Sequence, residues 1–163
     1  MRKRVPTPPG TTGRLIELYD PRSGRESMAD LETGAVRAPD LMRFRGDNDQ
    51  GRAWLKEKGI DLMACPRTDS GDQGIAGYDM LVAKIDNRRF DALDLKEAQR
   101  ALEKAETQAE KAPATVMSTK SELPVTYAFR TREGSVGVLQ INDARVTESP
   151  AVFRLRYKLL KKP

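Results

Sequence analysis

The side chains able to perform acid–base or covalent chemistry are few in kind in this sequence. It contains no histidine, which is the usual general base near neutral pH and the commonest zinc ligand. Cys65 is the only cysteine, so the chain can form neither an internal disulfide nor a cluster of thiolates around a metal ion. Nucleophile pairs of the serine–histidine and cysteine–histidine types are therefore excluded.

Any catalysis would have to rest on the acidic side chains, of which the chain has 24. Paired carboxylates hydrolyse glycosides when a cleft holds them at a set separation, usually beside aromatic platforms for the sugar. One tryptophan and four tyrosines, most of which the strand patterns assign to core faces, disfavour such a cleft. We predict no catalytic residue, no metal-ligand set and no cofactor. A small hydrolase that uses acidic residues alone stays as an alternative.

Basic side chains gather at the C-terminal end of the chain. Residues 154–163 hold five of them and no acid, which equals the net charge of +5 of the whole chain, so the remainder is neutral. A neutral body with a basic end differs from a uniformly basic nucleic-acid-binding protein. The alternative to a functional role is a solvated strand face whose charges discourage edge-to-edge association. A surface able to meet phosphates or an acidic partner is predicted from Arg130, Arg132, Arg154, Arg156 and Lys158.

The elements that position these residues are clearest in the last forty residues. Apolar and polar side chains alternate along 125–132 and along 152–160, which is the period of strands with one buried and one wet face. The stretch REGS, residues 132–135, separates two strands, and Gly134 can take the positive φ that a hairpin turn often needs. We predict a C-terminal β-meander whose buried face packs against a long helix, with the charged residues of the turn exposed.

Upstream of this meander, the sequence predicts short strands and two helices. Asp49 is a good N-cap for a helix that stops at Gly59. Residues 94–111 carry one apolar stripe and a capping-box-like start, and they form the longer helix. Strands are predicted at 14–20, within 26–39 around a turn at 32–34, at 60–65 and at 78–85, and a loop is predicted at 66–77.

Together these elements predict a single α+β domain over residues 14–160. Its core is a mainly antiparallel sheet of about five to seven strands with two principal helices. Residues 1–13, rich in proline, glycine and basic residues, are predicted to be a disordered tail. Residues 112–124, bounded by Pro113 and Pro124, are predicted to be a connector.

The stretch YAFRTREGSVGVLQI, residues 127–141, and RYKL, residues 156–159, carry a resemblance. They resemble an uncharacterised C-terminal module of planctomycete-type bacterial signalling proteins, whose pattern runs as FKTREGGxGxLQI and then RYKL. Ser135 stands where that pattern commonly has a second glycine. The pieces DLETG, AWLKEKGID and GYDML are also similar to segments that precede the module. Proteins of this kind resemble extracytoplasmic-function sigma factors and BlaR-type sensor peptidases, and the resemblance carries over no functional residues.

The resemblance implies a sensory or accessory domain, with any catalysis elsewhere in a parent chain. We therefore predict a non-catalytic sensory or protein-interaction module of a bacterial signalling or membrane-associated protein, whose protein partner or small ligand is open. The alternative from another class is a small nucleic-acid-binding domain that uses the basic C-terminal strand. No apolar run approaches the roughly 18 residues that span a membrane, and the N-terminus lacks the apolar segment of a signal peptide. The chain as written is expected to be soluble, and the resemblance implies an extracytoplasmic domain of a longer, membrane-anchored protein.

Overall fold

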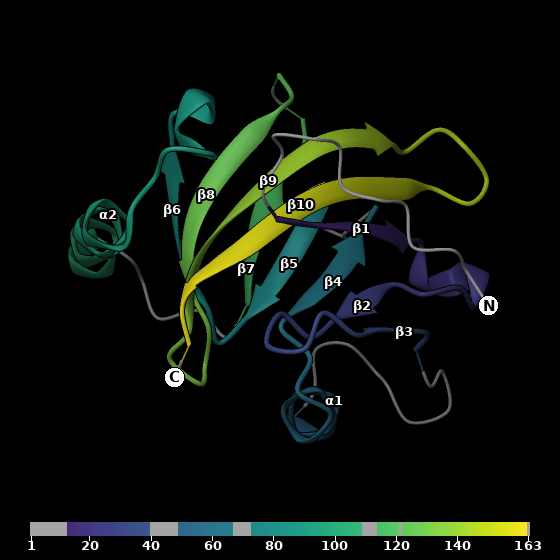
Figure 1. Cartoon of the computed structure of the whole chain (residues 1–163). Helices are drawn as coiled ribbons and strands as arrows, with labels where there is room; N and C mark the ends of the chain where they lie inside the picture. The colour runs from purple at the N-terminus through teal and green to yellow at the C-terminus, as the bar shows by residue number, and fades with distance from the viewer. Residues whose placement is uncertain (1–12, 40–48, 67–72, 109–113, 121, 163) are drawn as a thin grey trace.

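The computed structural model describes residues 13–39, 49–66, 73–108, 114–120 and 122–162, and these form an α+β fold built mainly of antiparallel strands (Figure 1). Two sheets contain five strands each within the described residues: the first has the order β1-β10-β9-β8-β6 and the second the order β3-β2-β4-β5-β7. The first sheet comprises β1 (Arg14–Tyr19), β6 (Leu81–Ile85), β8 (Val125–Arg130), β9 (Val136–Arg145) and β10 (Val152–Lys161). The second comprises β2 (Met28–Ala29), β3 (Val36–Arg37), β4 (Leu62–Cys65), β5 (Gly74–Tyr78) and β7 (Ala114–Ser118). The helices are α1 (Asp49–Glu57) and α2 (Leu95–Gln108), with 3-10 turns η1 (Pro21–Ser23) and η2 (Asn87–Arg89).

The predicted C-terminal meander is confirmed, because β8, β9 and β10 are neighbours in the first sheet. Its first hairpin closes through residues 131–135, where the Thr131 N–H donates to the Ser135 carbonyl oxygen at 2.9 Å. Gly134 in this turn has φ +100°, as the sequence predicted. A side chain at Gly137 would collide with the Phe129 ring and with the Lys158 carbonyl oxygen, so the two neighbouring strands also require glycine there.

The apolar faces of the two sheets pack against each other. Leu18, Phe129 and Phe153 of the first sheet are fully buried in one cluster with Leu62 and Ile75 of the second. This corrects the expectation that the apolar face of the meander packs against the long helix. The second sheet covers that face, and it does so because its own strands also present apolar side chains inward.

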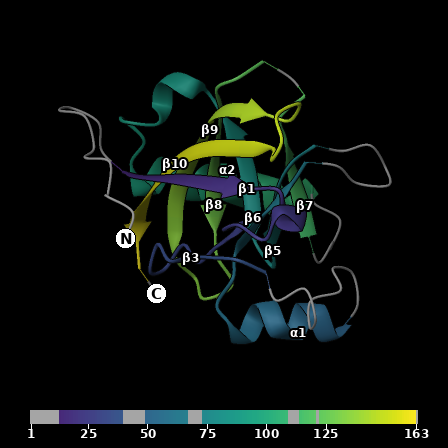
Figure 2. The same cartoon turned by 90° about the vertical axis from the view of Figure 1, so that its right-hand side faces the viewer.

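The helices lie on the outer faces of the sandwich, which gives the order helix, sheet, sheet, helix. Ala98 and Leu102 of α2 pack in a cluster with Ala128 of β8 and Val138 of β9. The start of α2 is capped, since the Asp94 carboxylate accepts the Glu97 N–H at 2.8 Å. On the other side, Leu55, Met28 and Met63 form a third buried cluster under α1. Figure 2, turned by 90°, shows α1 outside the sheets, below β3 and β5.

Three local expectations differ from the structure. The predicted loop at 66–77 contains the first residues of β5, and the predicted connector at 112–124 contains β7. The predicted strand at 78–85 is divided at Asp79, whose φ is +51°. Small residues led to the first difference: a Cβ at Gly74 would lie 1.9 Å from the Met117 carbonyl oxygen, so this buried strand needs glycine where the sequence resembles a loop.

Several expectations fall on residues that the structure does not describe. The predicted tail at 1–13 lies outside the described residues except for Gly13, as does the end of the predicted helix at 109–111. Among the helices of the described ranges, none is both long and apolar enough to cross a membrane.

Candidate functional site

A tight turn of residues 30–34, between β2 and β3, lies at the centre of the candidate site. The Asp30 carboxylate closes it by accepting the N–H of Glu32 at 2.8 Å and of Thr33 at 3.3 Å. The Gly34 N–H donates to the Asp30 carbonyl oxygen at 2.7 Å, and Gly34 has φ +74°. This is the local geometry that aspartate and glycine favour, and we call the segment the 30–34 turn.

Glu32 joins the 30–34 turn to the hairpin turn of the first sheet. The Thr131 hydroxyl donates to one oxygen of the Glu32 carboxylate at 2.6 Å, and the Ser135 hydroxyl donates to the other oxygen. The Ser135 N–H in turn donates to the Thr131 hydroxyl at 3.1 Å, so both hydroxyls have fixed positions. Thr131 and Ser135 are both buried. One carboxylate therefore links segments about one hundred residues apart, from opposite sheets.

Asp61, just before β4, supports the same turn from the second sheet. It is fully buried, and one of its carboxylate oxygens accepts the Leu31 N–H at 2.8 Å. The other oxygen is buried and has no hydrogen-bond partner among the described residues. Burial raises the pKa of Asp61 to about 7, the Leu31 N–H opposes this rise, and nearby carboxylates, first that of Glu133, add to it.

The sequence did not single out Asp61 or Glu32. The available signal for Asp61 was a lone carboxylate inside the apolar run IDLMAC. Glu32 stood only within a predicted turn. Within the described ranges, no three acidic or cysteine side chains are placed to hold a metal ion. The hydrogen bonds of Glu32 and Asp61 make this cluster a junction between elements.

Arg132 lies in the hairpin turn but is not exposed, contrary to the prediction. Its side chain is 13% exposed, and its Nε donates to the Asp79 carboxylate at 3.0 Å. Both terminal nitrogens are buried without a hydrogen-bond partner in the described part of the chain, and one lies 3.8 Å from the Glu133 carboxylate. The unusual backbone of Asp79, where β5 ends, places its carboxylate opposite Arg132.

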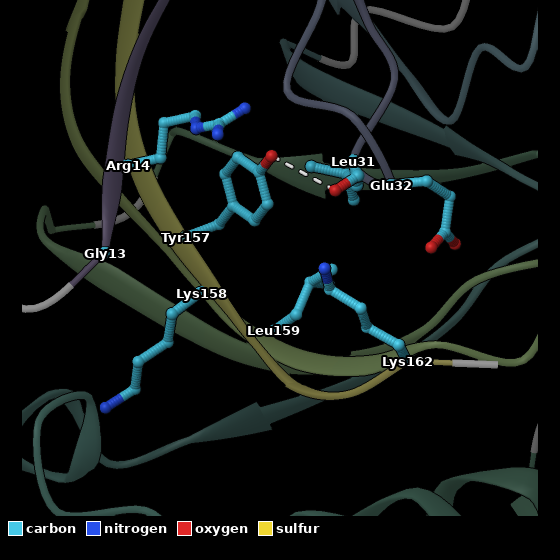
Figure 3. A pocket seen from close by; sticks show the side chains of 8 residues that line it. All are labelled: Gly13, Arg14, Leu31, Glu32, Tyr157, Lys158, Leu159 and Lys162. Atoms are coloured by element: carbon cyan, nitrogen blue, oxygen red, sulfur yellow. Dashed lines mark hydrogen bonds between the residues drawn. The ribbon is translucent and has the colours of Figure 1, made fainter.

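A pocket of about 200 Å³ opens beside the 30–34 turn (Figure 3). The Tyr157 hydroxyl donates to the Leu31 carbonyl oxygen at 3.1 Å, and Arg14 donates to the Thr33 carbonyl oxygen at 2.5 Å, so β10 and β1 both hold the turn. Burial raises the pKa of Tyr157, and Arg14 opposes that rise. We call this the Arg14 pocket, lined by Gly13, Arg14, Leu31, Glu32, Tyr157, Lys158, Leu159 and Lys162.

Four residues of the predicted basic surface share the outer face of the first sheet, and the fifth does not. Arg154, Arg156 and Lys158 do stand in a row on the outer face of β10, as predicted. Arg130 lies on β8 and pairs with Glu106 of α2 at 3.2 Å. The fifth member is Arg132, which is turned inward.

The three cations of the row on β10 have protein partners. Arg154 pairs with Glu17 of β1 at 3.2 Å and with Asp143 of β9 at 3.1 Å. The Arg156 guanidinium lies 3.9 Å from the centre of the Phe90 ring. It also donates to the Gln140 side chain at 3.0 Å. Lys158 donates to the Asp91 carbonyl oxygen at 3.2 Å. The row therefore binds neighbouring strands and the segment after β6, which matches the solvated-face alternative better than a free phosphate-binding surface.

These features define an α+β sandwich with a polar junction and a small pocket between its sheets. No protein-family model, no curated protein and no solved structure matches the chain. The resemblance to the C-terminal module of planctomycete-type signalling proteins therefore stays a prediction.

Proposed function

We propose that this chain is a non-catalytic sensory or interaction module, an accessory domain of a bacterial signalling or membrane-associated protein, whose ligand site is the Arg14 pocket. One observation carries the proposal: four of the five segments that carry the resemblance meet at the 30–34 turn. TREGS contacts it through Thr131 and Ser135, and RYKL through Tyr157. KEKGID contributes Asp61, and DLETG is the turn itself. Convergence of distant segments on one pocket wall is expected of a binding site that a rigid scaffold supports.

The carboxylates of this region support binding more than catalysis. Both oxygens of Glu32 accept hydroxyl hydrogen bonds, and Asp61 is enclosed beneath the turn. A general base has to reach a substrate proton directly or through one water. These two carboxylates instead accept hydrogen bonds from donors of the protein, and they hold the wall of the pocket in place.

Nucleic-acid binding receives less support from the structure. Arg154 is shared between two carboxylates, and Arg156, whose side chain is 17% exposed, contacts Phe90 and Gln140. A phosphate would have to displace these partners before it gained the same contacts. We therefore keep the row on β10 as a structural feature of the first sheet.

An NMR titration of the ¹⁵N-labelled chain tests the proposal. Small acids, amines, amides, sugars and nucleotides are added one at a time, and each compound is afterwards recovered and identified. We expect at least one class to shift the amides of the 30–34 turn saturably and to be recovered unchanged. If the chain instead converts a bound compound, and Asp61→Asn or Glu32→Gln abolishes that conversion, the protein is an enzyme that uses acidic residues. If no compound of the panel shifts the amides of the 30–34 turn, the Arg14 pocket is not a ligand site.

A further inference from the structure

We propose that the Arg14 pocket binds one carboxylate group carried on a short apolar stem, with Arg14 and Lys162 holding the carboxylate. This rests on the proposed binding function and names its ligand class. The two cations come from β1 and from the residue after β10, so they approach the pocket from neighbouring strands of the first sheet.

Arg14 is held in position with most of its donors left over. Its guanidinium lies directly over Gly34, where any Cβ would overlap it, and one N–H donates to the Thr33 carbonyl oxygen. A guanidinium has five N–H donors in a fixed planar fork that matches a carboxylate. The Thr33 carbonyl oxygen and the Tyr157 hydroxyl, which also interacts with the Arg14 side chain, therefore orient the guanidinium, and its remaining donors can bind an anion.

Lys162 adds a second charge at the mouth of the pocket. Its side chain is exposed, no described residue pairs with its ammonium, and Figure 3 shows the side chain directed toward Leu31 and Tyr157. Lys158 lines the pocket as well, but its ammonium points away, toward the Phe90 ring and the Asp91 carbonyl oxygen.

Glu32 offsets only part of the charge of these two cations. Its carboxylate is turned from the Tyr157 ring in Figure 3 and accepts the two hydroxyls of the hairpin turn. The charge near the pocket mouth is thus positive, which favours an anion. Asp30 and Asp61 lie behind the wall and oppose negative charge near Tyr157, so the two cations are needed to hold one carboxylate, and a second negative charge on the ligand is disfavoured.

The size of the pocket limits the ligand. At about 30 Å³ for each water-sized group, 200 Å³ accepts about six or seven non-hydrogen atoms. Leu31, Leu159 and the Tyr157 ring supply apolar wall, and Arg14 and Lys162 lie at the rim. A carboxylate of this size with an aliphatic stem, such as butyrate, matches both the apolar wall and the two cations.

The test compares butyrate with its neutral isostere butyramide, with butylamine and with inorganic phosphate, by NMR titration of the full chain. We expect saturable butyrate binding at the 30–34 turn, at least about tenfold tighter than that of butyramide, since a charge-assisted hydrogen bond contributes about this factor or more. Lys162→Gln should weaken butyrate binding about tenfold without unfolding the chain, because Lys162 is exposed. Lys161→Gln, the same change one residue away on an exposed lysine that does not line the pocket, is the control and should leave it unchanged.

Other outcomes overturn the ligand class and leave the binding function standing. The ligand class is wrong if butyrate and butyramide bind equally, or if butylamine or phosphate binds more tightly than butyrate. It is also wrong if Lys161→Gln weakens butyrate binding as much as Lys162→Gln does. In each case the amides of the 30–34 turn still shift, so the binding function stands. If none of the four probes shifts the turn, the carboxylate proposal fails; the wider panel then decides whether the pocket binds at all. Free metabolites and protein C-termini share this chemistry. A short peptide ending in valine, compared with its C-terminal amide, separates them, because only a site for C-termini binds the free acid more tightly than butyrate.

Discussion

Relative to the parent chain, Asp61→Asn should gain stability as the pH rises from about 4 to about 7. The folded-state pKa of Asp61 is raised from 3.8 to about 7, chiefly by burial. The folded chain therefore holds a proton that the unfolded chain has already lost between about pH 4 and pH 7, and the free energy of unfolding falls as pH rises through this range. The full difference corresponds to about 4 kcal/mol, of which asparagine, uncharged at every pH, should recover a large part.

The measurement is urea unfolding of both chains at a series of pH values from about 4.5 to 8.5. The difference between the two free energies removes the contributions of other titrating groups, provided that the slopes against urea agree. It should grow by about 1.4 kcal/mol for each pH unit and level off above about pH 7.5. Glu57→Gln, at an exposed carboxylate on α1, is the matched control and should show no such growth.

Asparagine also introduces a second N–H donor, which costs about 1–3 kcal/mol if it stays unpaired. This cost does not vary with pH, so it shifts the difference curve without changing its slope. A constant difference between Asp61→Asn and the parent over the whole range would refute the reasoning. A decline of the variant above pH 7 would show that the ionised carboxylate is stabilising, and the Leu31 N–H would then outweigh burial.

Three further predictions concern the two sheets and their junction. Phe153→Ala should cost about 3–5 kcal/mol in urea unfolding because the ring is fully buried between the sheets, whereas Leu15→Ala, at 44% exposure, should change stability by about 0.5 kcal/mol or less. Gly134→Val should cost about 1–3 kcal/mol through its backbone at φ +100° alone, since a Cβ there meets nothing within 4 Å; an unchanged unfolding midpoint would contradict this. Glu32→Ala should cost about 2 kcal/mol by leaving two buried hydroxyls without their acceptor, and Glu32→Gln should recover part of that; equal losses in both would mean that the charge, and not the hydrogen bonding, matters.

The sequence predicted the meander well because alternation acts through local geometry. A period of two determines which side chains share a face, and β10 places Phe153 and Leu155 inward and Arg154 and Arg156 outward. It does not determine what covers each face. Ala128 and Val138 lie under α2, on the face that was predicted to be exposed to solvent. Both side chains are small, so their types alone do not distinguish a buried face from an exposed one.

Two strands of the second sheet were harder to predict for a different reason. β2, β3 and β4 lie where strands were predicted, but β5 reads GIAGY, whose glycines resemble a turn, and β7 lies in the predicted connector. These strands exist because their neighbours provide hydrogen-bond partners and cover them, which is tertiary information. β7, in the predicted connector, pairs with β5 from Gly74 to Tyr78 along its full length.

The candidate basic surface shows that the sequence also does not reveal which partners its charged side chains have. The row of cations on β10 was predictable from spacing alone, but Glu17, which pairs with Arg154, is 137 residues away in the chain. Arg132 was predicted to be exposed because it lies in a turn. Its partner Asp79 comes from the end of β5, a strand that the sequence did not reveal.

The 30–34 turn connects ligand binding in the Arg14 pocket with protonation of Asp61, and the two can be measured separately. Leu31 donates its N–H to Asp61 and accepts the Tyr157 hydroxyl through its carbonyl oxygen, so one peptide segment contacts the buried carboxylate and the pocket wall. A ligand bound to Arg14, which donates to the Thr33 carbonyl oxygen, acts on this segment, and so does ionisation of Asp61. Because linkage between two sites is reciprocal, a ligand that favours one state of the turn must change the proton affinity of Asp61 by the factor by which pH changes its own affinity. Ligand binding measured on both sides of pH 7, in the parent and in Asp61→Asn, therefore measures the coupling free energy between the pocket and Asp61.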